Sequence, residues 1–318
     1  MSRVRAMIKP LLSALIVVCT GYFFFRAFRR NWADVKAHEF RIAPLFVAGA
    51  LLAAFTTCLL ATFAWYSAMN ELSRSKIGFR QSVAAVNASS LTKYIPGKIW
   101  SYALQMYWLD GLGFSKALIV YVNLVNLLIS LGTSLILGLL CLVVSGGGLP
   151  VRLVVGALFG LLVIDACSIL FNRALLNVLI GVANRLLKRS FSYFEIKKSL
   201  LVKLHLIHLV SGVTSGLGAY LFCFGIGYRI DLNRALVVIG SSLVSDVVGF
   251  LAIIVPGGLG VREGLMYKML GGSATGTLAL VLPVASRMMN MFVDITLGAV
   301  ALKLLQTLAA ARRAASPR

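Results

Sequence analysis

The sequence predicts an all-α integral membrane protein with about six full transmembrane helices and two broken re-entrant helical hairpins, in two inverted-topology repeats. The first observation behind this prediction is composition: 59% of the 318 residues are hydrophobic, 13% are charged, and the mean hydropathy is +0.91. A soluble domain of this size could not bury so much apolar surface. The second is a series of long apolar runs, and the third is a pair of Pro-Gly breaks that recur 160 residues apart.

Six apolar runs are long enough to cross the hydrocarbon core, which takes about 20 residues of α-helix. They lie near residues 8–27, 43–69, 117–144, 151–171, 204–226 and 277–304. The first run follows a basic N-terminus but lacks a small-residue cleavage site, so we expect it to be a membrane helix rather than a cleaved signal peptide. The five cysteines are scattered singly without metal-ligand spacing and are expected to be small buried side chains.

Two further segments, about 80–108 and 233–269, are apolar enough to enter the membrane but contain helix breakers. Unpaired backbone groups are costly in hydrocarbon, so a break is tolerated only against protein or a water-filled cavity. We therefore predict two hairpins, each entering and leaving on one side. The residues expected to set the hairpin geometry are Pro96 and Gly97 in the first segment and Pro256, Gly257, Gly258 and Gly260 in the second.

An internal repeat relates the two breaks. The residues that coincide under the shift are Pro96 with Pro256, Gly97 with Gly257 and Gly138 with Gly298, and, after a gap of eight residues, Ser89-Ser90 with Ser241-Ser242. Each unit holds three full spans, an odd number, so the second copy must be upside down. The alternative is two independent proline kinks in ordinary spans.

The repeats divide a single polytopic membrane domain, residues 1–318, into repeat one, about 7–145, and repeat two, about 150–308, before a short cytoplasmic tail at 309–318. Lys and Arg are more numerous on the side that carries both termini, which predicts that both termini are cytoplasmic. The net charge of +21 resides mainly in short segments between apolar runs. Anionic lipid explains such segments, so no nucleic-acid partner is expected.

Charged and polar side chains in or beside the broken segments are the candidate site, because an ionisable residue at membrane depth is by default a functional hypothesis. Basic residues near half-helix N-termini suit an anionic group such as a lipid phosphate. The predicted head-group ligands are Lys93, Lys98, Arg262, Arg287 and Asn126. The residues predicted to balance charge or carry protons are Asp246, Glu263, Asp294 and His205.

Structural roles are the alternative for these residues. Serines and asparagines at helical spacing often join helices, charges can form a structural ion-pair network, and a lone histidine is usually a packing residue. Arg262 and Glu263 are adjacent and cannot share one helical face, so each is expected to pair elsewhere. Asp246 and Asp294 are both candidate partners for Arg262.

The motif PGGLGVREG at 256–264, preceded by a Ser-rich helix and matched by SSLTKYIPGKIW at 89–100, resembles the transmembrane region of lysylphosphatidylglycerol synthase/flippase proteins. The resemblance covers nearly the whole chain. Members with both activities carry a soluble aminoacyl-transferase domain after the membrane part. No such domain is expected in a chain ending at Arg318, which is similar to the stand-alone members, and no enzyme activity is expected.

What the resemblance implies is a lipid flippase-like protein of the bacterial or archaeal cytoplasmic membrane. The lipid, anionic or zwitterionic, stays open among aminoacylated, hopanoid and polyprenyl-linked lipids. The alternatives are a membrane-embedded transferase acting on a lipid carrier and a non-catalytic partner of a lipid-modifying enzyme. Besides the lipid, a homo-oligomer and a separate lipid-modifying enzyme are the partners left open. No catalytic residue, metal or cofactor is predicted.

Overall fold

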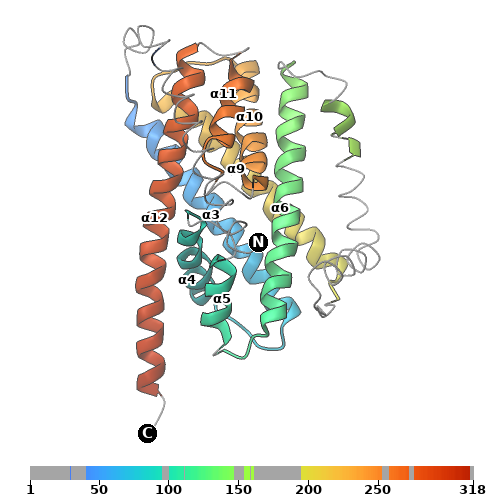
Figure 1. The fold of residues 1–318 in the computed structure, drawn as a ribbon, viewed down its shortest axis with the longest axis vertical. Coiled ribbons are helices and arrows are strands. Elements are labelled where there is room, and N and C mark those ends of the chain that lie inside the picture. Colours follow the sequence, from blue (N-terminus) through green and yellow to red (C-terminus); the bar gives the residue numbers. More distant parts are fainter. Residues whose placement is uncertain are drawn as a thin grey trace, which may run out of the picture.

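The computed structural model describes residues 41–94, 100–110, 112–146, 195–252, 258–271 and 276–315, together with a few isolated positions. Every regular element in these ranges is a helix, which confirms the predicted all-α class (Figure 1). The elements are α3 (Pro44–Leu72), α4 (Phe79–Ser90), the short 3-10 helix η1 (Leu91–Tyr94), α5 (Trp100–Asp110), α6 (Lys116–Val144), α9 (Lys198–Gly225), α10 (Leu232–Leu251), α11 (Val261–Leu270) and α12 (Gly276–Ala315).

Five helices of the described part are long and apolar enough to cross a membrane: α3, α6, α9, α10 and α12. Four of them coincide with predicted apolar runs. The predicted run at 8–27, and most of the run at 151–171, lie outside the described residues. The protein is therefore a multi-pass membrane protein by helix length and composition.

Polar side chains within these helices satisfy backbone groups, as hydrocarbon requires. The Ser115 hydroxyl accepts a hydrogen bond from the N–H of Leu118 at the start of α6. The Asp231 carboxylate accepts one from Arg234 at the start of α10. Inside α3, the Thr62 hydroxyl donates to the carbonyl of Cys58. Such bonds cap helix ends and hide polar groups from lipid, so the apolar runs fold as uninterrupted helices.

The central pair of helices, α3 and α9, runs antiparallel. The N–H of Ala43, just before α3, donates to the carbonyl of Gly225 at the end of α9, at 3.0 Å. Midway along, the hydroxyls of Thr57 and Thr214 lie 2.9 Å apart. Small residues allow this approach, because a Cβ on Gly218 would lie only 3.3 Å from the Cβ of Ala53. Since α3 and α9 are corresponding spans of the predicted repeats, their antiparallel packing is the arrangement that an inverted repeat requires.

Two glycines that coincide in the predicted repeat make equivalent contacts. A Cβ on Gly138 of α6 would lie 3.1 Å from the Cβ of Leu243 on α10. A Cβ on Gly298 of α12 would lie 2.5 Å from the Cγ of Leu91 in η1. Leu91 and Leu243 follow the serine pairs that coincide in the predicted repeat. In both halves, therefore, the glycine of one helix lies against the corresponding leucine of the other repeat. The contacts support the inverted repeat, whose boundaries remain a prediction.

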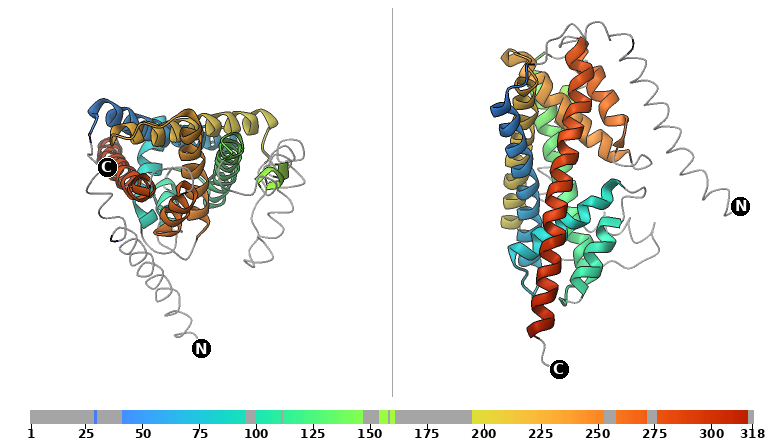
Figure 2. Two further views of the ribbon diagram at one scale, coloured as in Figure 1. Left: turned by 90° about the horizontal axis from the view of Figure 1, so that it is seen from above. Right: turned by 90° about the vertical axis from the view of Figure 1, so that its left-hand side faces the viewer.

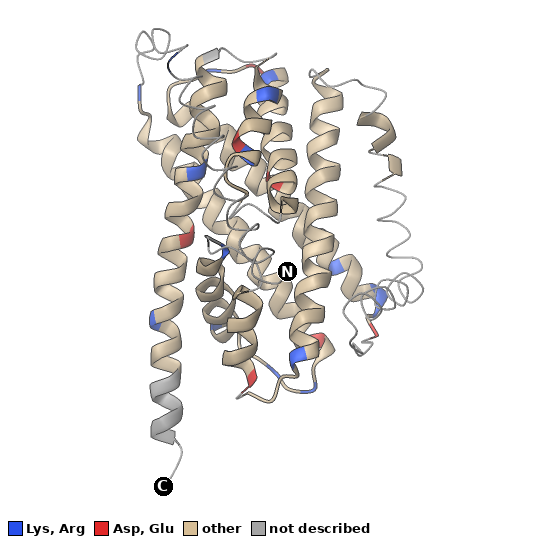
Figure 3. Ribbon diagram, viewed as in Figure 1, with Lys and Arg blue, Asp and Glu red and all other residues tan. Residues whose placement is uncertain are grey.

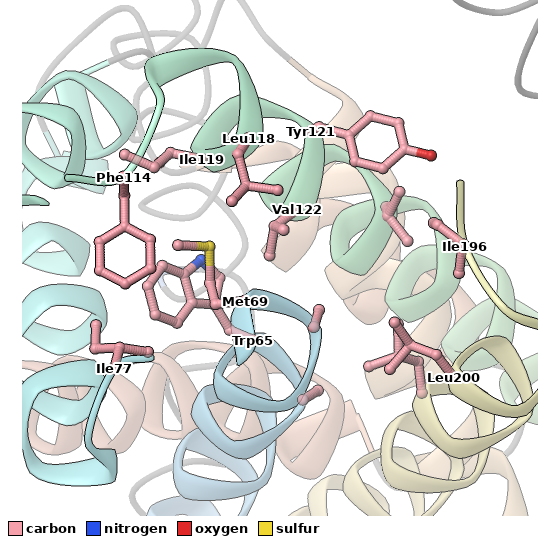
Figure 4. Close-up of a cluster of buried hydrophobic side chains, with 14 of the residues drawn as sticks. Trp65, Met69, Ile77, Phe114, Leu118, Ile119, Tyr121, Val122, Ile196 and Leu200 are labelled. Atoms are coloured by element: carbon pink, nitrogen blue, oxygen red, sulfur yellow. The ribbon is translucent and has the colours of Figure 1, made fainter. Parts of the chain in front are cut away.

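Apolar side chains fill two clusters. One joins α3, α6 and the start of α9, where Trp65, Met69 and Phe114 lie against Leu118 and Val122 (Figure 4). The other joins α9, α10, α11 and α12. Lipid is as apolar as these side chains, so dispersion contacts rather than water exclusion stabilise them. The clusters fix the helices that carry the charged residues.

Both predicted breaks separate helices, although residues 95–99 and 253–257, with Pro96, Gly97, Pro256 and Gly257, lie outside the described ranges. On the far side of the second break, Gly258 and Gly260 adopt φ of 68° and 86°. A Cβ on Gly258 would lie 2.4 Å from the carbonyl oxygen of Gly249, so only glycine fits there. Glycine thus brings the start of α11 against α10.

One helix of the two broken segments, α10, is longer than the predicted hairpins require. Helices α4, α5 and α11 have 12, 11 and 10 residues, too few to cross a bilayer. Helix α10 has 20 residues, which is long enough to cross the membrane. The first arm of the second broken segment is therefore a membrane-length helix and not the shorter helix of the predicted hairpin. Helix α12 has 40 residues, continues to Ala315 through most of the predicted tail, and projects beyond its neighbours (Figure 2).

Candidate functional site

A cavity of about 360 Å³ lies between the two broken segments and α12. Residues from α3, η1, α5, α9, α10, α11 and α12 line it, so both predicted repeats contribute walls. Its charged lining residues are Lys93, Asp246, Arg262, Arg287 and Asp294. Figure 3 shows that acidic and basic residues occur midway along the bundle as well as at its ends. The cavity therefore places charged side chains at the depth of the hydrophobic helices.

Arg262 and Asp246 form the first ion pair of the cavity. Arg262 lies in the first turn of α11, and its Nε contacts Oδ1 of Asp246 near the end of α10. Gly249, almost one turn after Asp246, gives the arginine room, because a Cβ there would lie 2.8 Å from the Cβ of Arg262. The structure thus selects Asp246, rather than Asp294, as the partner of Arg262. This pair joins the two helices of the second broken segment.

Arg287 and Glu263 form a buried pair that ties α11 to α12. The Nη1 of Arg287 donates to Oε1 of Glu263 at 3.0 Å, and both side chains are almost fully buried. The second carboxylate oxygen of Glu263 accepts a 2.6 Å hydrogen bond from the N–H of Gly260 at the start of α11. One carboxylate therefore caps a helix and holds an arginine. A buried ion pair is tolerated when further hydrogen bonds of this kind satisfy its oxygens.

Lys93 and Asp294 form the third pair, between η1 and α12. The Lys93 ammonium lies 2.5 Å from Oδ2 of Asp294. The lysine belongs to the first predicted repeat and the aspartate to the second, 201 positions later. This pair therefore joins the first broken segment to the last helix, across the boundary of the two repeats.

Three of the predicted charged or polar site residues do not line the cavity: Glu263, whose partner Arg287 does line it, Asn126 and His205. Asn126 lies between α6 and α9, where its Oδ1 is 3.2 Å from Nε2 of His208. The Nδ1 of His205 lies 2.7 Å from the carbonyl oxygen of Leu201 on its own helix. His208, three residues after His205 on α9, points toward α6 and is not among the cavity residues either. Lys98 lies outside the described residues.

Several cavity residues were not predicted from the sequence. Thr57 and Cys58 contribute from α3, and Ser101 and Tyr102 contribute from α5. Small polar residues in an apolar helix do not stand out from those that only join helices. The internal repeat held a signal for one of them, because the 160-residue shift that aligns the breaks places Tyr102 on Arg262.

Neighbouring polar residues form a hydrogen-bonded network that joins helices. The Gln105 amide of α5 donates to Ser89 of α4 at 2.9 Å, and its oxygen accepts from Asn123 of α6 at 2.7 Å. Asn87 of α4 donates to Thr62 of α3 at 3.1 Å. In the described ranges no three His, Cys, Asp or Glu side chains gather as metal ligands would. Neutral hydrogen bonds thus hold α4 and α5 of the first broken segment against α3 and α6, whereas the ion pairs lie at the cavity.

Comparison with known proteins identifies the family. No curated protein matches the chain. The family model described as "Lysylphosphatidylglycerol synthase TM region" matches residues 7–298, which include both broken segments and all the charged residues of the cavity. The resemblance noted in the PGGLGVREG motif is therefore confirmed over most of the sequence. The chain belongs to the lysylphosphatidylglycerol synthase transmembrane-region family.

Proposed function

We propose that the protein is a lipid flippase-like transporter that moves an anionic or zwitterionic lipid between the leaflets of a bacterial or archaeal cytoplasmic membrane. The head group crosses through the charged cavity while the acyl chains stay in the bilayer. The observation that carries the proposal is that a cavity at the depth of the membrane-length helices is lined by at least one charged side chain from each of three ion pairs. Membership of a membrane-domain family named for a lipid synthase supports a lipid substrate.

In this proposal the charged side chains of the cavity bind the lipid head group while it crosses the membrane. A head group leaving water loses its hydration, and the cavity replaces that hydration with fixed charges. Arginine and lysine bind phosphate oxygens with charge-assisted hydrogen bonds, so Arg262, Lys93 and, in our proposal, Lys98 and Arg287 are the phosphate ligands. Asp246, Asp294 and Glu263 balance these cations when no lipid is bound, and they receive an amine when the head group carries one.

Broken helices and inverted repeats provide the mechanism of movement. In our proposal the two broken segments are re-entrant hairpins that approach the cavity from opposite faces, and both termini are cytoplasmic. Rocking of one repeat against the other would then expose the same site to each leaflet in turn. The antiparallel α3–α9 pair and the two equivalent glycine contacts are consistent with such a pseudo-two-fold axis.

A reconstitution experiment tests the function. The purified protein is placed in vesicles that contain a trace of head-group-labelled lipid, and the fraction protected from an impermeant quencher is followed over time. The panel covers an anionic phospholipid, a zwitterionic phospholipid, an aminoacylated phospholipid and a polyprenyl phosphate. We expect faster exchange than in protein-free vesicles for at least one lipid. Equal exchange with and without protein across the whole panel would reject the flippase and favour a transferase or a scaffold.

A further inference from the structure

The two halves of the molecule close equivalent interfaces in different ways. Where α6 meets α10, the contact is between backbones: a Cβ on Gly240 would lie 2.7 Å from the carbonyl oxygen of Gly138. Where α12 meets η1, the three atoms nearest to a Cβ on Gly298 would all belong to the Leu91 side chain. Nearly one turn earlier on α12 lies Asp294 with its Lys93 partner. Side chains can move aside more readily than packed backbones, so of these two contacts the one between α12 and η1 is the easier to open.

The Lys93–Asp294 pair also marks the place where the cavity reaches the surface. Both residues line the cavity, yet the Lys93 side chain is 46% exposed whereas that of Asp294 is 9% exposed. Asp294 lies about midway along the apolar stretch Thr277–Leu308. The outer face of α12 around it carries the exposed apolar side chains of Phe292 and Ile295, a composition suited to lipid. The pair therefore separates a polar interior from the hydrocarbon at mid-depth.

We propose that the Lys93–Asp294 pair closes a lateral portal between η1 and α12, through which a lipid head group passes between the bilayer and the cavity. This inference rests on the flippase function proposed above and adds the route of entry. About 360 Å³ holds a head group but not two acyl chains, so the chains stay outside and the head group passes between helices.

The charges of the Lys93–Asp294 pair determine which lipid head groups are expected to open the portal. Separating two opposite charges in a low-dielectric setting is costly unless new partners replace them. A head-group phosphate replaces Asp294 as the partner of Lys93, and a head-group amine replaces Lys93 as the partner of Asp294. A neutral lipid such as a diacylglycerol offers neither exchange. The portal is thus expected to open for charged head groups and to stay shut for neutral lipid.

Cys58 provides a reporter inside the cavity, and it does not require transport. Its side chain lines the cavity from α3. The test protein is the full chain with Cys19, Cys141, Cys167 and Cys223 replaced by serine, reconstituted in vesicles containing a phospholipid with a maleimide on its head group. A water-soluble maleimide in parallel vesicles reports access from the aqueous side. The same protein with Cys58→Ser measures background labelling.

The variants separate portal opening from changes in thiol reactivity. Asp294→Asn breaks the pair, and the exchange Lys93→Asp with Asp294→Lys restores it in reverse. Gly298→Ala adds a methyl group that displaces Leu91 without changing charge. Leu91→Ala loosens the same contact by truncation, in case Gly298→Ala does not fold. Gly138→Ala alters the equivalent position in the other half and is the matched control.

We expect the lipid maleimide to label Cys58 several-fold faster in Asp294→Asn, and in Gly298→Ala or Leu91→Ala, than in the parent. The double variant Lys93→Asp with Asp294→Lys, and the control Gly138→Ala, are expected to be labelled at the parent rate. The portal is rejected when only the water-soluble maleimide reaches Cys58, or when lipid labelling is the same in every variant. A different result would reject the proposed flippase function but not the portal: no lipid exchange in the vesicle assay, although Cys58 is labelled in the expected pattern.

Discussion

At the scale of single residues, the site depends on charges that satisfy one another and on glycines that leave them room. Glu263 is the clearest example, because one carboxylate oxygen caps α11 at Gly260 and the other binds Arg287. Gly249 and Gly258 have no Cβ: Arg262 at the start of α11 fills the space at Gly249, and the Gly249 backbone of α10 fills the space at Gly258. Removing a partner or adding a methyl group therefore has consequences that the local chemistry predicts.

Removing one member of the buried Arg287–Glu263 pair is expected to cost more stability than removing both. Glu263→Ala leaves an arginine without its carboxylate, and breaking a buried pair costs about 3–5 kcal/mol. The double variant Glu263→Leu with Arg287→Met should recover much of that loss, as measured by thermal unfolding in detergent. The double variant is nevertheless expected to remain inactive in transport. Recovery of transport together with stability would show that the pair is only structural.

Gly258→Ala tests the close approach of α11 to α10. The left-handed φ of 68° and the 2.4 Å approach to the Gly249 oxygen predict a destabilisation of about 1–3 kcal/mol or more. Gly264→Ala is the matched control, since that glycine lies inside α11 with no atom within 4 Å of its Cβ position. The control should be as stable as the parent or slightly more stable, because alanine favours helix. Similar melting temperatures for both variants would refute this account of the turn.

At the scale of elements, helix packing relies on backbones that approach closely at small residues. The contact of α6 with α10 is one of these, because Gly138 and Gly240 face each other directly. The α3–α9 pair uses glycine, alanine and threonine for the same purpose. In lipid, such approaches give the dispersion contacts on which helix association depends.

Gly240→Ala is expected to destabilise the protein by about 1–3 kcal/mol, the usual cost of overpacking. Its new Cβ would lie 2.7 Å from the Gly138 oxygen, which the backbone cannot relieve without separating the two helices. Gly212→Ala serves as the comparison, because its Cβ would meet only the end of the Leu137 side chain at 3.2 Å. Thermal unfolding in detergent should rank Gly240→Ala well below Gly212→Ala. The reverse order would contradict the packing described here.

The helices were easier to predict than the contacts between them. Apolar runs with few charges located α3, α6 and α9, and the proline and glycine breaks located the ends of α4, α10 and α11, because both signals are local. The length of α12 was underestimated, since its apolar run ends before a segment rich in Ala, Leu, Gln and Arg that also favours helix. Hydropathy alone does not reveal such an extension.

Charge partners show the same limit. Arg262 was limited to two candidate partners because few acids occur in the membrane, and the structure chose the nearer one in sequence. The Lys93–Asp294 pair could not be predicted, because it depends on how η1 packs against α12. Asn126 was expected in the cavity, but its helix turns it toward His208. Direction around a helix is fixed by tertiary packing, which a single sequence does not contain.

At the scale of the whole molecule, two predicted repeats of opposite topology enclose one charged cavity. The equivalent glycine–leucine contacts and the antiparallel α3 and α9 support this arrangement. The two repeats differ in their charges, because the ion pairs of the cavity concentrate around α11, α12 and η1. A symmetric framework with asymmetric charge suits a path that a head group follows between two faces.

Both breaks are expected to matter equally for transport. Gly97→Leu and Gly257→Leu each replace a glycine that is predicted to set the hairpin geometry, and each variant should lose most of its lipid exchange in vesicles while keeping its fold. The fold is checked by monodisperse elution and by an unchanged melting temperature. A stable Gly97→Leu protein with full activity, beside an inactive Gly257→Leu, would show that the two breaks do not act as a symmetric pair.

The central claim is that the head group crosses through the cavity at Arg262, and vesicle exchange of the transported lipid by two arginine variants tests it most directly. Arg262→Gln removes a cation that lines the cavity, whereas Arg229→Gln removes an exposed cation between α9 and α10. The account predicts that Arg262→Gln loses most of the exchange above protein-free vesicles and that Arg229→Gln retains it. Full exchange by a stably folded Arg262→Gln would contradict the account.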